Sequence, residues 1–378
     1  MTKPIPGNVV FNSLKDKNCI VLAANPRVVP GVAHGIMRAA KELDAAVIFE
    51  MAKSEVNLDG GYTGLTPETF SKRIHEVAND VGHDIWVLHA DHITIKKGTR
   101  EEIEDTKKLI AQQIENGYTS FAIDPSHLYN FEGGNLREEL ALNIDVTTEL
   151  AKFIESNMGG KPYGLEVEVG EIGRTDEHGR VLTTPEEGVT FIKALNENGV
   201  YPQVLAIANG STHGNIYDEA GNPIEQVSID IPQTKAVAKA LRDNNLDVRI
   251  AQHGITGTPR ELINTQFPKG DIVKGNVATF YQNIVYDIIK IFYPEKYQNI
   301  QNWVIDTYKE KAPGKKNIEL FGKFAKFGIK QFFDDIYNLD EDTMKALEAM
   351  CYAETLGFLR AFNSKGSAEI VRKTLQLA

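Results

Sequence analysis

The sequence predicts an α/β fold in which eight parallel strands close into a (β/α)8 TIM barrel, followed by a C-terminal helical extension. Short apolar runs alternate with longer amphipathic stretches, and this order repeats eight times. The runs are continuously apolar, which is typical of parallel strands covered by helices on both faces. Eight such units are the number that closes a barrel, so this fold is favoured over an open, doubly wound sheet.

The predicted strands are short runs rich in valine, isoleucine, leucine and alanine. They comprise residues 19–23, 46–51, 85–89, 120–123, 164–169, 204–208, 248–251 and 272–274. Each is followed by a stretch with apolar residues at helical spacing, which predicts a helix. These helices comprise residues 32–43, 67–81, 100–116, 136–156, 186–198, 233–244, 259–265 and 277–291.

The pattern changes after the eighth unit, so we expect a catalytic barrel domain over residues 1–294 and a helical extension over 295–378. Helical periodicity covers residues 301–310 and 342–362. The stretch 323–337 carries many aromatic side chains, which need a surface to pack against. The extension is therefore expected to pack on the barrel or at an oligomer interface, and we expect a homo-oligomer.

Composition limits the classes of partner. The chain has 378 residues and a formal net charge of -11, so it lacks the basic field that attracts nucleic acid or an anionic membrane. Two cysteines, Cys19 and Cys351, are too few for a disulfide framework, and no signal peptide opens the sequence. No apolar stretch approaches the roughly 20 residues that span a bilayer. We therefore predict a cytoplasmic enzyme with a small-molecule substrate.

Histidines at the ends of predicted strands indicate a metal site. His92 follows the third strand, His213 the sixth and His253 the seventh. The C-terminal ends of barrel strands surround one bowl, so these three side chains should lie close together. Three histidines around one open position are typical of a catalytic zinc site, and another divalent metal would fit the same ligands.

Acidic residues accompany these histidines. Asp91 precedes a predicted ligand and is expected to exchange a proton with a substrate hydroxyl. His89 lies three positions before His92, so we expect it one layer lower in a supporting role. Glu166 and Glu168 share one strand face. Two inward carboxylates repel each other unless a cation lies between them, so at least one should touch a metal or an arginine.

The loops after the last two predicted strands suit an anion. They read Gln252-His253-Gly254-Ile255-Thr256-Gly257-Thr258-Pro259 and Lys274-Gly275-Asn276-Val277-Ala278-Thr279. Phosphate is commonly bound at this end of a barrel by loops that contain glycines and hydroxyl groups and lead into a helix. The backbone N–H groups and the helix dipole attract the anion. Plain turns use the same residues, so the predicted place in the barrel is what favours a phosphate site.

Several motifs together resemble one enzyme family. In order along the chain they are His89-Ala90-Asp91-His92, Gly117-Tyr118-Thr119-Ser120-Phe121-Ala122-Ile123-Asp124-Pro125-Ser126-His127-Leu128, Leu165-Glu166-Val167-Glu168-Val169-Gly170, His213-Gly214, His253-Gly254 and Lys274-Gly275-Asn276. From about the first strand to the eighth, the sequence is similar to the class II, metal-dependent fructose-bisphosphate aldolases. The resemblance implies a lyase of glycolysis and gluconeogenesis. It implies zinc bound by His92, His213 and His253, with Asp91 taking the C4 hydroxyl proton.

The resemblance also implies further site residues. Asp124 and Glu168 match positions of a second or displaced metal site. The positions that match substrate or phosphate contacts, often with a monovalent cation nearby, are Asn25, Gly214, Gly254, Thr256, Gly257, Asn276 and Thr279. Asp176, with Glu177 next to it, stands where the family places a proton-transferring glutamate.

The chain departs from the family pattern at positions expected to bind the substrate. They are Ala52 for a serine, Ile93 for a small residue, Pro125 for a glycine, Arg174 for a small residue, Ile255-Thr256 for glycine-serine and Ala278 for an aspartate. These changes affect how the aldehyde half of the substrate and its second phosphate would be bound, whereas the predicted metal ligands are all retained. Arg174 or Lys53 would be able to replace lost phosphate contacts.

The favoured function is cleavage of fructose 1,6-bisphosphate to dihydroxyacetone phosphate and glyceraldehyde 3-phosphate. Alternatives are the same reaction on tagatose bisphosphate or a ketose 1-phosphate, and a sugar-phosphate binder without turnover. A metal-dependent hydrolase would need a His-x-His pair where the chain has Ala24-Asn25-Pro26. A Schiff-base aldolase would need a lysine after the sixth strand, where the chain has Ala206-Ile207-Ala208-Asn209.

Overall fold

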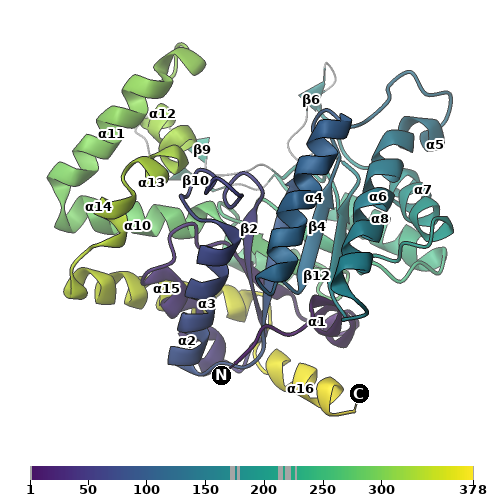
Figure 1. Ribbon diagram of the computed structural model, residues 1–378, viewed down its shortest axis with the longest axis horizontal. Coiled ribbons are helices and arrows are strands. Elements are labelled where there is room, and N and C mark those ends of the chain that lie inside the picture. Colours follow the sequence, from purple (N-terminus) through teal and green to yellow (C-terminus); the bar gives the residue numbers. More distant parts are fainter. Residues whose placement is uncertain are drawn as a thin grey trace.

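A computed structural model describes residues 2–170, 175–176, 179–211, 216–217, 223–225 and 228–377. Eight parallel strands form a closed barrel in the order β1-β12-β11-β8-β5-β4-β3-β2, which confirms the predicted fold class (Figure 1). The barrel strands are β1 (Val21–Ala24), β2 (Val47–Ala52), β3 (Trp86–Thr94), β4 (Ser120–Asp124), β5 (Gly164–Glu168), β8 (Val204–Ala206), β11 (Arg249–Gln252) and β12 (Ile272–Val277). Two short antiparallel pairs, β6 (Thr175–Asp176) with β7 (Gly179–Arg180) and β9 (Ile216–Tyr217) with β10 (Pro223–Ile224), lie outside the barrel.

Helices between the strands surround the barrel. They are α2 (Val32–Glu42), α3 (Pro67–Val81), α4 (Arg100–Glu115), α5 (Leu136–Glu139), α6 (Ala141–Met158), α7 (Pro185–Glu197), α8 (Ile231–Asp243), α9 (Arg260–Gln266) and α10 (Thr279–Phe292). Side chains of Thr66, Thr99, Thr184 and Asp230 cap the starts of α3, α4, α7 and α8 by accepting a backbone N–H bond. Such caps satisfy donors that the first turn leaves without an intrahelical partner. The predicted helix over 136–156 divides into α5 and α6.

A short N-terminal helix closes the bottom of the barrel. Helix α1 (Gly7–Leu14) is anchored by Ile5 N, which donates to Trp86 O at 2.8 Å, and by Gly7 N, which donates to Thr119 O at 3.0 Å. A Cβ atom at Gly7 would lie 2.5 Å from Ser120 Oγ, so only glycine allows this close approach. Val10, Phe11 and Leu14 join the apolar interior of the strands. Sequence periodicity did not predict α1, because eight residues barely exceed two turns.

The C-terminal helices lie outside the barrel and pack mainly on the helices that surround it, most of them on the side of α2 and α10 (Figure 1). They are α11 (Pro294–Tyr308), α12 (Asn317–Phe324), α13 (Gly328–Gln331), α14 (Phe333–Tyr337), α15 (Glu341–Ala361) and α16 (Ser367–Leu377). Helix α15 lies against α2 so closely that a Cβ at Gly35 would be 2.4 Å from Glu348 O. The aromatic segment contacts the loop after β2, where Tyr62 and Phe327 rings lie 5.5 Å apart. The domain boundary at residue 294 and the oligomer stay predictions.

Among the described residues, no helix is long and apolar enough to cross a membrane.

Candidate metal centre

A bulge in β3 turns two consecutive side chains toward one cavity. The pairing of β3 with β4 shifts register between Ala90 and Ile93, and His92 has a φ of +37°. Consecutive side chains of a regular strand face opposite sides, and a bulge is the usual way to redirect one of them. Asp91 and His92 therefore both line the same cavity at the C-terminal ends of the strands. The positive φ of a non-glycine residue is strain that the surrounding barrel maintains.

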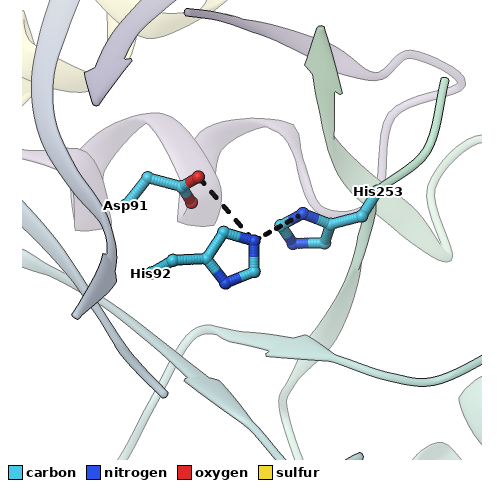
Figure 2. A group of neighbouring side chains, drawn as sticks. All are labelled: Asp91, His92 and His253. Carbon is cyan, nitrogen blue, oxygen red and sulfur yellow. Dashed lines mark hydrogen bonds and ion pairs between the residues drawn. The ribbon is translucent and has the colours of Figure 1, made fainter. Parts of the chain in front are cut away.

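The bulge brings His92 next to His253, which follows β11. Figure 2 shows the two rings and Asp91 pointing toward one another from opposite strands. His92 Nε2 lies 3.1 Å from His253 Nδ1 and 3.9 Å from Asp91 Oδ2. One ligand atom from each of the three residues lies within 4.8 Å of the others. Two imidazoles and a carboxylate this close form a site that can hold a divalent cation.

Two further carboxyl groups lie on the other side of the His92 ring. His92 Nδ1 is 3.1 Å from Glu168 Oε2 and 3.3 Å from Asp124 Oδ2. Glu168 and Asp124 are both buried. The structure thus brings together four of the five residues that were predicted as metal ligands, namely Asp124, His92, Glu168 and His253. The fifth, His213, lies outside the described residues.

The charges at this centre fit a cation. Burial disfavours the imidazolium form of His92, but Asp91, Glu168 and Asp124 outweigh burial and hold its pKa well above the usual value. Burial lowers the pKa of His253, and His92 lowers it further. Burial raises the pKa of Glu168 to about 8, with Asp124 adding to the effect. A buried site that must take up protons to balance its carboxylates is suited to a metal ion, which would supply the same positive charge.

One layer deeper, a buried lysine occupies the centre of the barrel. Lys274 Nζ lies 2.8 Å from Glu166 Oε2, 2.9 Å from Glu50 Oε2 and 3.3 Å from Asp91 Oδ1. It also lies 3.3 Å from His89 Nε2. Of the two carboxylates Glu166 and Glu168, at least one of which was expected to touch a metal or an arginine, Glu166 is paired with this ammonium group instead. His89 lies in the deeper layer, as predicted from its spacing, and donates or accepts a bond with Ser120 Oγ at 2.8 Å.

This ammonium group argues against a metal in the deeper layer. Glu50, His89 and Asp91 are close enough to hold an ion, with ligand atoms within 4.8 Å of one another. Lys274 already contacts all three, and its pKa is raised because the carboxylates outweigh the effect of its burial. A metal there would meet a fixed positive charge in a low-dielectric interior. The metal centre is therefore the upper layer around His92 and His253.

The cavity above this layer has a volume of about 360 Å³. The predicted substrate and phosphate residues that line it are Asn25, Gly254, Thr256, Asn276 and Thr279. Ala52 and Ala278, two of the departures from the family pattern, line it as well. Asn25 Oδ1 and Asn276 Oδ1 are buried and accept no hydrogen bond from the described residues. Buried acceptors in a cavity wall are suited to hydroxyl donors of a ligand.

Other predicted residues lie elsewhere. Lys53 does not line the cavity, because its Nζ donates to Thr94 O at 2.9 Å and Thr106 Oγ1 at 2.8 Å. Its expected contact with a phosphate is at odds with this position. Gly257 is also absent from the described lining. Arg174, Glu177 and Gly214 lie outside the described residues, and Asp176 is described only as part of the backbone of β6.

The structure adds residues that the sequence pattern did not single out. Arg27 is buried in the cavity wall and bonds to Glu55 Oε1 at 2.9 Å, Gln282 Oε1 at 2.7 Å and Thr279 Oγ1 at 3.2 Å. Lys326, from the C-terminal extension, also lines the cavity. Neither follows a predicted strand at a recognisable motif. Arg27 lies two residues after Asn25 but belongs to none of the motifs, and Lys326 lies 50 residues after Asn276, the last residue of those motifs.

We expect Lys274→Met to lower the free energy of unfolding of the metal-free protein by about 3 kcal/mol or more, because a buried charge pair that loses one partner is strongly destabilised. Lys53→Met is the matched control and should cost about 1 kcal/mol, since it loses only hydrogen bonds to neutral groups. Denaturant unfolding measures both.

The cost of Lys274→Met should depend on pH. Burial alone would raise the pKa of Glu166, but Lys274, a hydrogen bond with His253 and the nearby His89 together outweigh burial and lower the pKa to about 2. The part of the wild-type advantage that comes from Lys274 therefore exists above the unfolded carboxyl value near 4 and shrinks as the pH falls toward 2. Equal costs for the two variants at neutral pH would contradict the assigned role of Lys274.

Comparison with known proteins places this arrangement in a family. The sequence profile described as fructose-bisphosphate aldolase class-II matches residues 8–326. A fructose-bisphosphate aldolase of Nostoc sp. strain PCC 7120 is 24% identical over 244 residues, which are 61% of this chain and 59% of that protein. A D-tagatose-1,6-bisphosphate aldolase subunit, GatZ, of Escherichia coli is 26% identical over 114 residues, which are 29% of this chain and 26% of that protein. The chain thus spans less than two thirds of the length of these relatives.

Solved structures show the same fold. The crystal structure of a fructose-bisphosphate aldolase from Campylobacter jejuni has a TM-score of 0.58 and 17% sequence identity, with 97% of each chain covered. Because that coverage includes the C-terminal helices, the likeness extends beyond the barrel itself. The profile match covers most of the chain and includes the metal centre and the cavity, and so the chain belongs to the class II fructose-bisphosphate aldolase family.

Proposed function

We propose that this protein catalyses the reversible, divalent-metal-dependent aldol cleavage of fructose 1,6-bisphosphate to dihydroxyacetone phosphate and glyceraldehyde 3-phosphate. One observation carries the proposal: the Asp91 carboxylate lies beside the nitrogens of His92 and His253 in a single cavity. Family membership supports the reaction class. Zinc is the proposed metal, and a cytoplasmic homo-oligomer is the proposed state of the enzyme.

Asp91 has the charge state that a general base needs. Burial alone would raise its pKa, but Lys274 and the histidines His92, His253 and His89 lower it well below the usual range. Asp91 is therefore an ionised carboxylate at neutral pH. In the cleavage direction it takes the proton of the C4 hydroxyl, and in condensation it returns that proton to the new alkoxide.

His92 and His253 would hold the metal, with Asp124 and Glu168 beside His92. When bound, a divalent cation supplies Lewis-acid stabilisation of the negative charge that the ketone half acquires as the C3–C4 bond breaks. Asn25 and Asn276 would orient hydroxyl groups through their buried amide oxygens. Asp176 and Glu177 remain the proposed source of the proton that the ketone half takes up. His213 remains the proposed third histidine ligand of the metal, and Gly214 remains a proposed phosphate contact.

The cavity wall also suits an anionic substrate. One corner holds Gly254, Thr256 and the start of α10, the proposed site of the first phosphate together with a monovalent cation. Arg27, Lys96 and Lys326 supply positive charge from three separate parts of the chain. Two anion-binding regions in one cavity support a bisphosphate over a monophosphate.

Lys274 does not support a Schiff-base mechanism. A lysine that forms an imine must lose its proton, whereas the three carboxyl groups around Lys274 raise its pKa. The specific alternative is the same reaction on tagatose 1,6-bisphosphate or a ketose 1-phosphate. It is favoured by Ala278, which leaves the cavity wall without the aspartate that the family pattern has there. A sugar-phosphate binder without turnover would bind these compounds and release no product.

Metal-loaded protein should release dihydroxyacetone phosphate from fructose 1,6-bisphosphate, and a chelator should abolish this release.

Asp91→Asn should lower kcat by about two orders of magnitude or more, the usual value of a positioned proton transfer, and keep the metal. His253→Ala should lose metal and activity together. Metal content and turnover measure these effects. Near-wild-type turnover of Asp91→Asn would remove Asp91 from the mechanism.

Lys326→Met should raise KM for fructose 1,6-bisphosphate about tenfold, because a charged hydrogen bond of roughly 1.5 kcal/mol is lost, and should leave KM for fructose 1-phosphate nearly unchanged. The matched control is Lys323→Met, since Lys323 is exposed on α12 of the same extension. Steady-state kinetics on both substrates measure the effect. Equal changes for the two substrates would mean that Lys326 does not contact the second phosphate.

A further inference from the structure

Tyr62 joins the C-terminal extension to the cavity wall. It lies in the loop between β2 and α3, and its backbone oxygen accepts a bond from Lys330 N of α13 at 3.2 Å. Its ring lies 5.5 Å from the ring of Phe327, and its hydroxyl donates to Glu55. Glu55, Tyr62 and Lys326 all line the cavity. The loop and the extension therefore form one wall of the site, although they are far apart in the chain.

Two cations lie next to the Tyr62 ring. The guanidinium carbon of Arg27 is 5.7 Å from the ring centroid, and Lys326 Nζ is 5.6 Å from it. Lys326 Nζ is also 5.3 Å from the centroid of the Phe327 ring. These distances are within the range of cation–π attraction, in which the ring attracts a positive charge. Tyr62 thus holds one cation of the barrel and one cation of the extension beside the same ring.

The positive charge at this wall exceeds the negative charge beside it. Glu55 already accepts four hydrogen bonds, which is about the number that a carboxylate can take. The donors are Arg27 Nε, the Tyr62 hydroxyl, Asn25 Nδ2 and Ala52 N. Among the described residues, the Lys326 ammonium group forms no ion pair or hydrogen bond. Burial lowers the pKa of Lys326, Arg27 lowers it further, and Glu55 offsets only part of this effect.

The donors that remain at this wall suit a phosphate group. Arg27 Nη1 contacts Gln282 Oε1 at 2.7 Å and Thr279 Oγ1 at 3.2 Å, and no described residue accepts a bond from Arg27 Nη2. The ammonium group of Lys326 keeps all of its donors. A phosphate dianion accepts charge-assisted hydrogen bonds from guanidinium and ammonium groups alike. Its charge would also balance the two cations, which Glu55 alone does not.

We infer that Tyr62 positions Arg27 and Lys326 as one binding site for the second phosphate of the ketose bisphosphate. The inference rests on the proposed function and deepens it, because it names the residue through which the extension takes part in substrate preference. Arg27 is also held by Glu55 and Gln282, whereas Lys326 is held by aromatic rings. Without the Tyr62 ring, the flexible Lys326 side chain would turn its ammonium group toward solvent.

The test compares the calorimetric affinity for fructose 1,6-bisphosphate with that for fructose 1-phosphate, which lacks the second phosphate. All proteins are zinc-loaded and carry Asp91→Asn, so that cleavage during the measurement is slow. The quantity is the ratio of the two Kd values, in which a loss common to both ligands cancels. Tyr62→Leu should lower the preference for the bisphosphate about tenfold, as expected for one lost charged hydrogen bond to phosphate. Tyr62→Phe keeps the ring and should keep the ratio within about twofold.

Further variants show how Tyr62 acts. Tyr62→Leu combined with Lys326→Met should lower the ratio no further than Lys326→Met alone, because the ring acts through this ammonium group. Tyr352→Leu is the matched control, since Arg38 lies 5.3 Å from that ring on α15 and Tyr352 does not line the cavity. This control should leave the ratio unchanged. If Tyr62→Leu does not fold, Tyr62→Met takes its place, because methionine fills irregular space with little strain.

Several results would overturn the inference. An equal loss of affinity for both ligands in Tyr62→Leu would make Tyr62 a structural residue. A further fall of the ratio in the double variant, or equal binding of both ligands by the parent protein, would also contradict it. Turnover by wild type is a separate result. Cleavage of fructose 1,6-bisphosphate with a ratio that ignores Tyr62→Leu refutes the inference alone, whereas the expected ratios without any cleavage by wild type refute the proposed function alone.

Discussion

The buried ammonium group of Lys274 is the interaction on which the polar interior of the barrel depends. It lies within 3.3 Å of oxygens from β2, β3 and β5 while its own strand is β12. Three carboxyl groups inside a barrel would otherwise repel one another in a medium that screens charge poorly. Because this cation satisfies them, Asp91 can remain an ionised base directly above the apolar layer closed by α1. The reactive layer and the stability of the barrel are therefore linked through one side chain.

The second constraint is the bulge in β3. It places Asp91 and His92 on the same cavity wall, although they are neighbours in sequence. A regular strand would bury one of them among the helices outside the barrel. The strained backbone at His92 is thus the structural basis for a base adjacent to a metal ligand.

The sequence predicted the barrel well because parallel strands and amphipathic helices have distinct periods, and every predicted strand overlaps an observed one. It also predicted that His92, His253, Asp124 and Glu168 meet, since residues at strand ends converge in this fold. It did not predict the roles of Lys274 or Glu50. Both lie within continuous apolar runs, where a charged residue gives no periodic signal, and their function depends on partners 183 and 226 residues away in the chain. Lys53 was predicted to contact a phosphate because of its charge, but its ammonium group bonds to a backbone oxygen and a threonine oxygen, and the residue does not line the cavity.

The measurement that tests the account most directly is the position of the metal in crystals of the zinc-loaded protein, located by anomalous scattering at the zinc edge. The account predicts one strong peak bonded to imidazole nitrogens of His92 and His253, with Lys274 still paired to Glu50 and Glu166 beneath it. A peak among Glu50, His89 and Asp91 would contradict it, because Lys274 would then have to leave the centre of the barrel. Crystals without bound zinc at saturating metal would contradict the metal centre altogether.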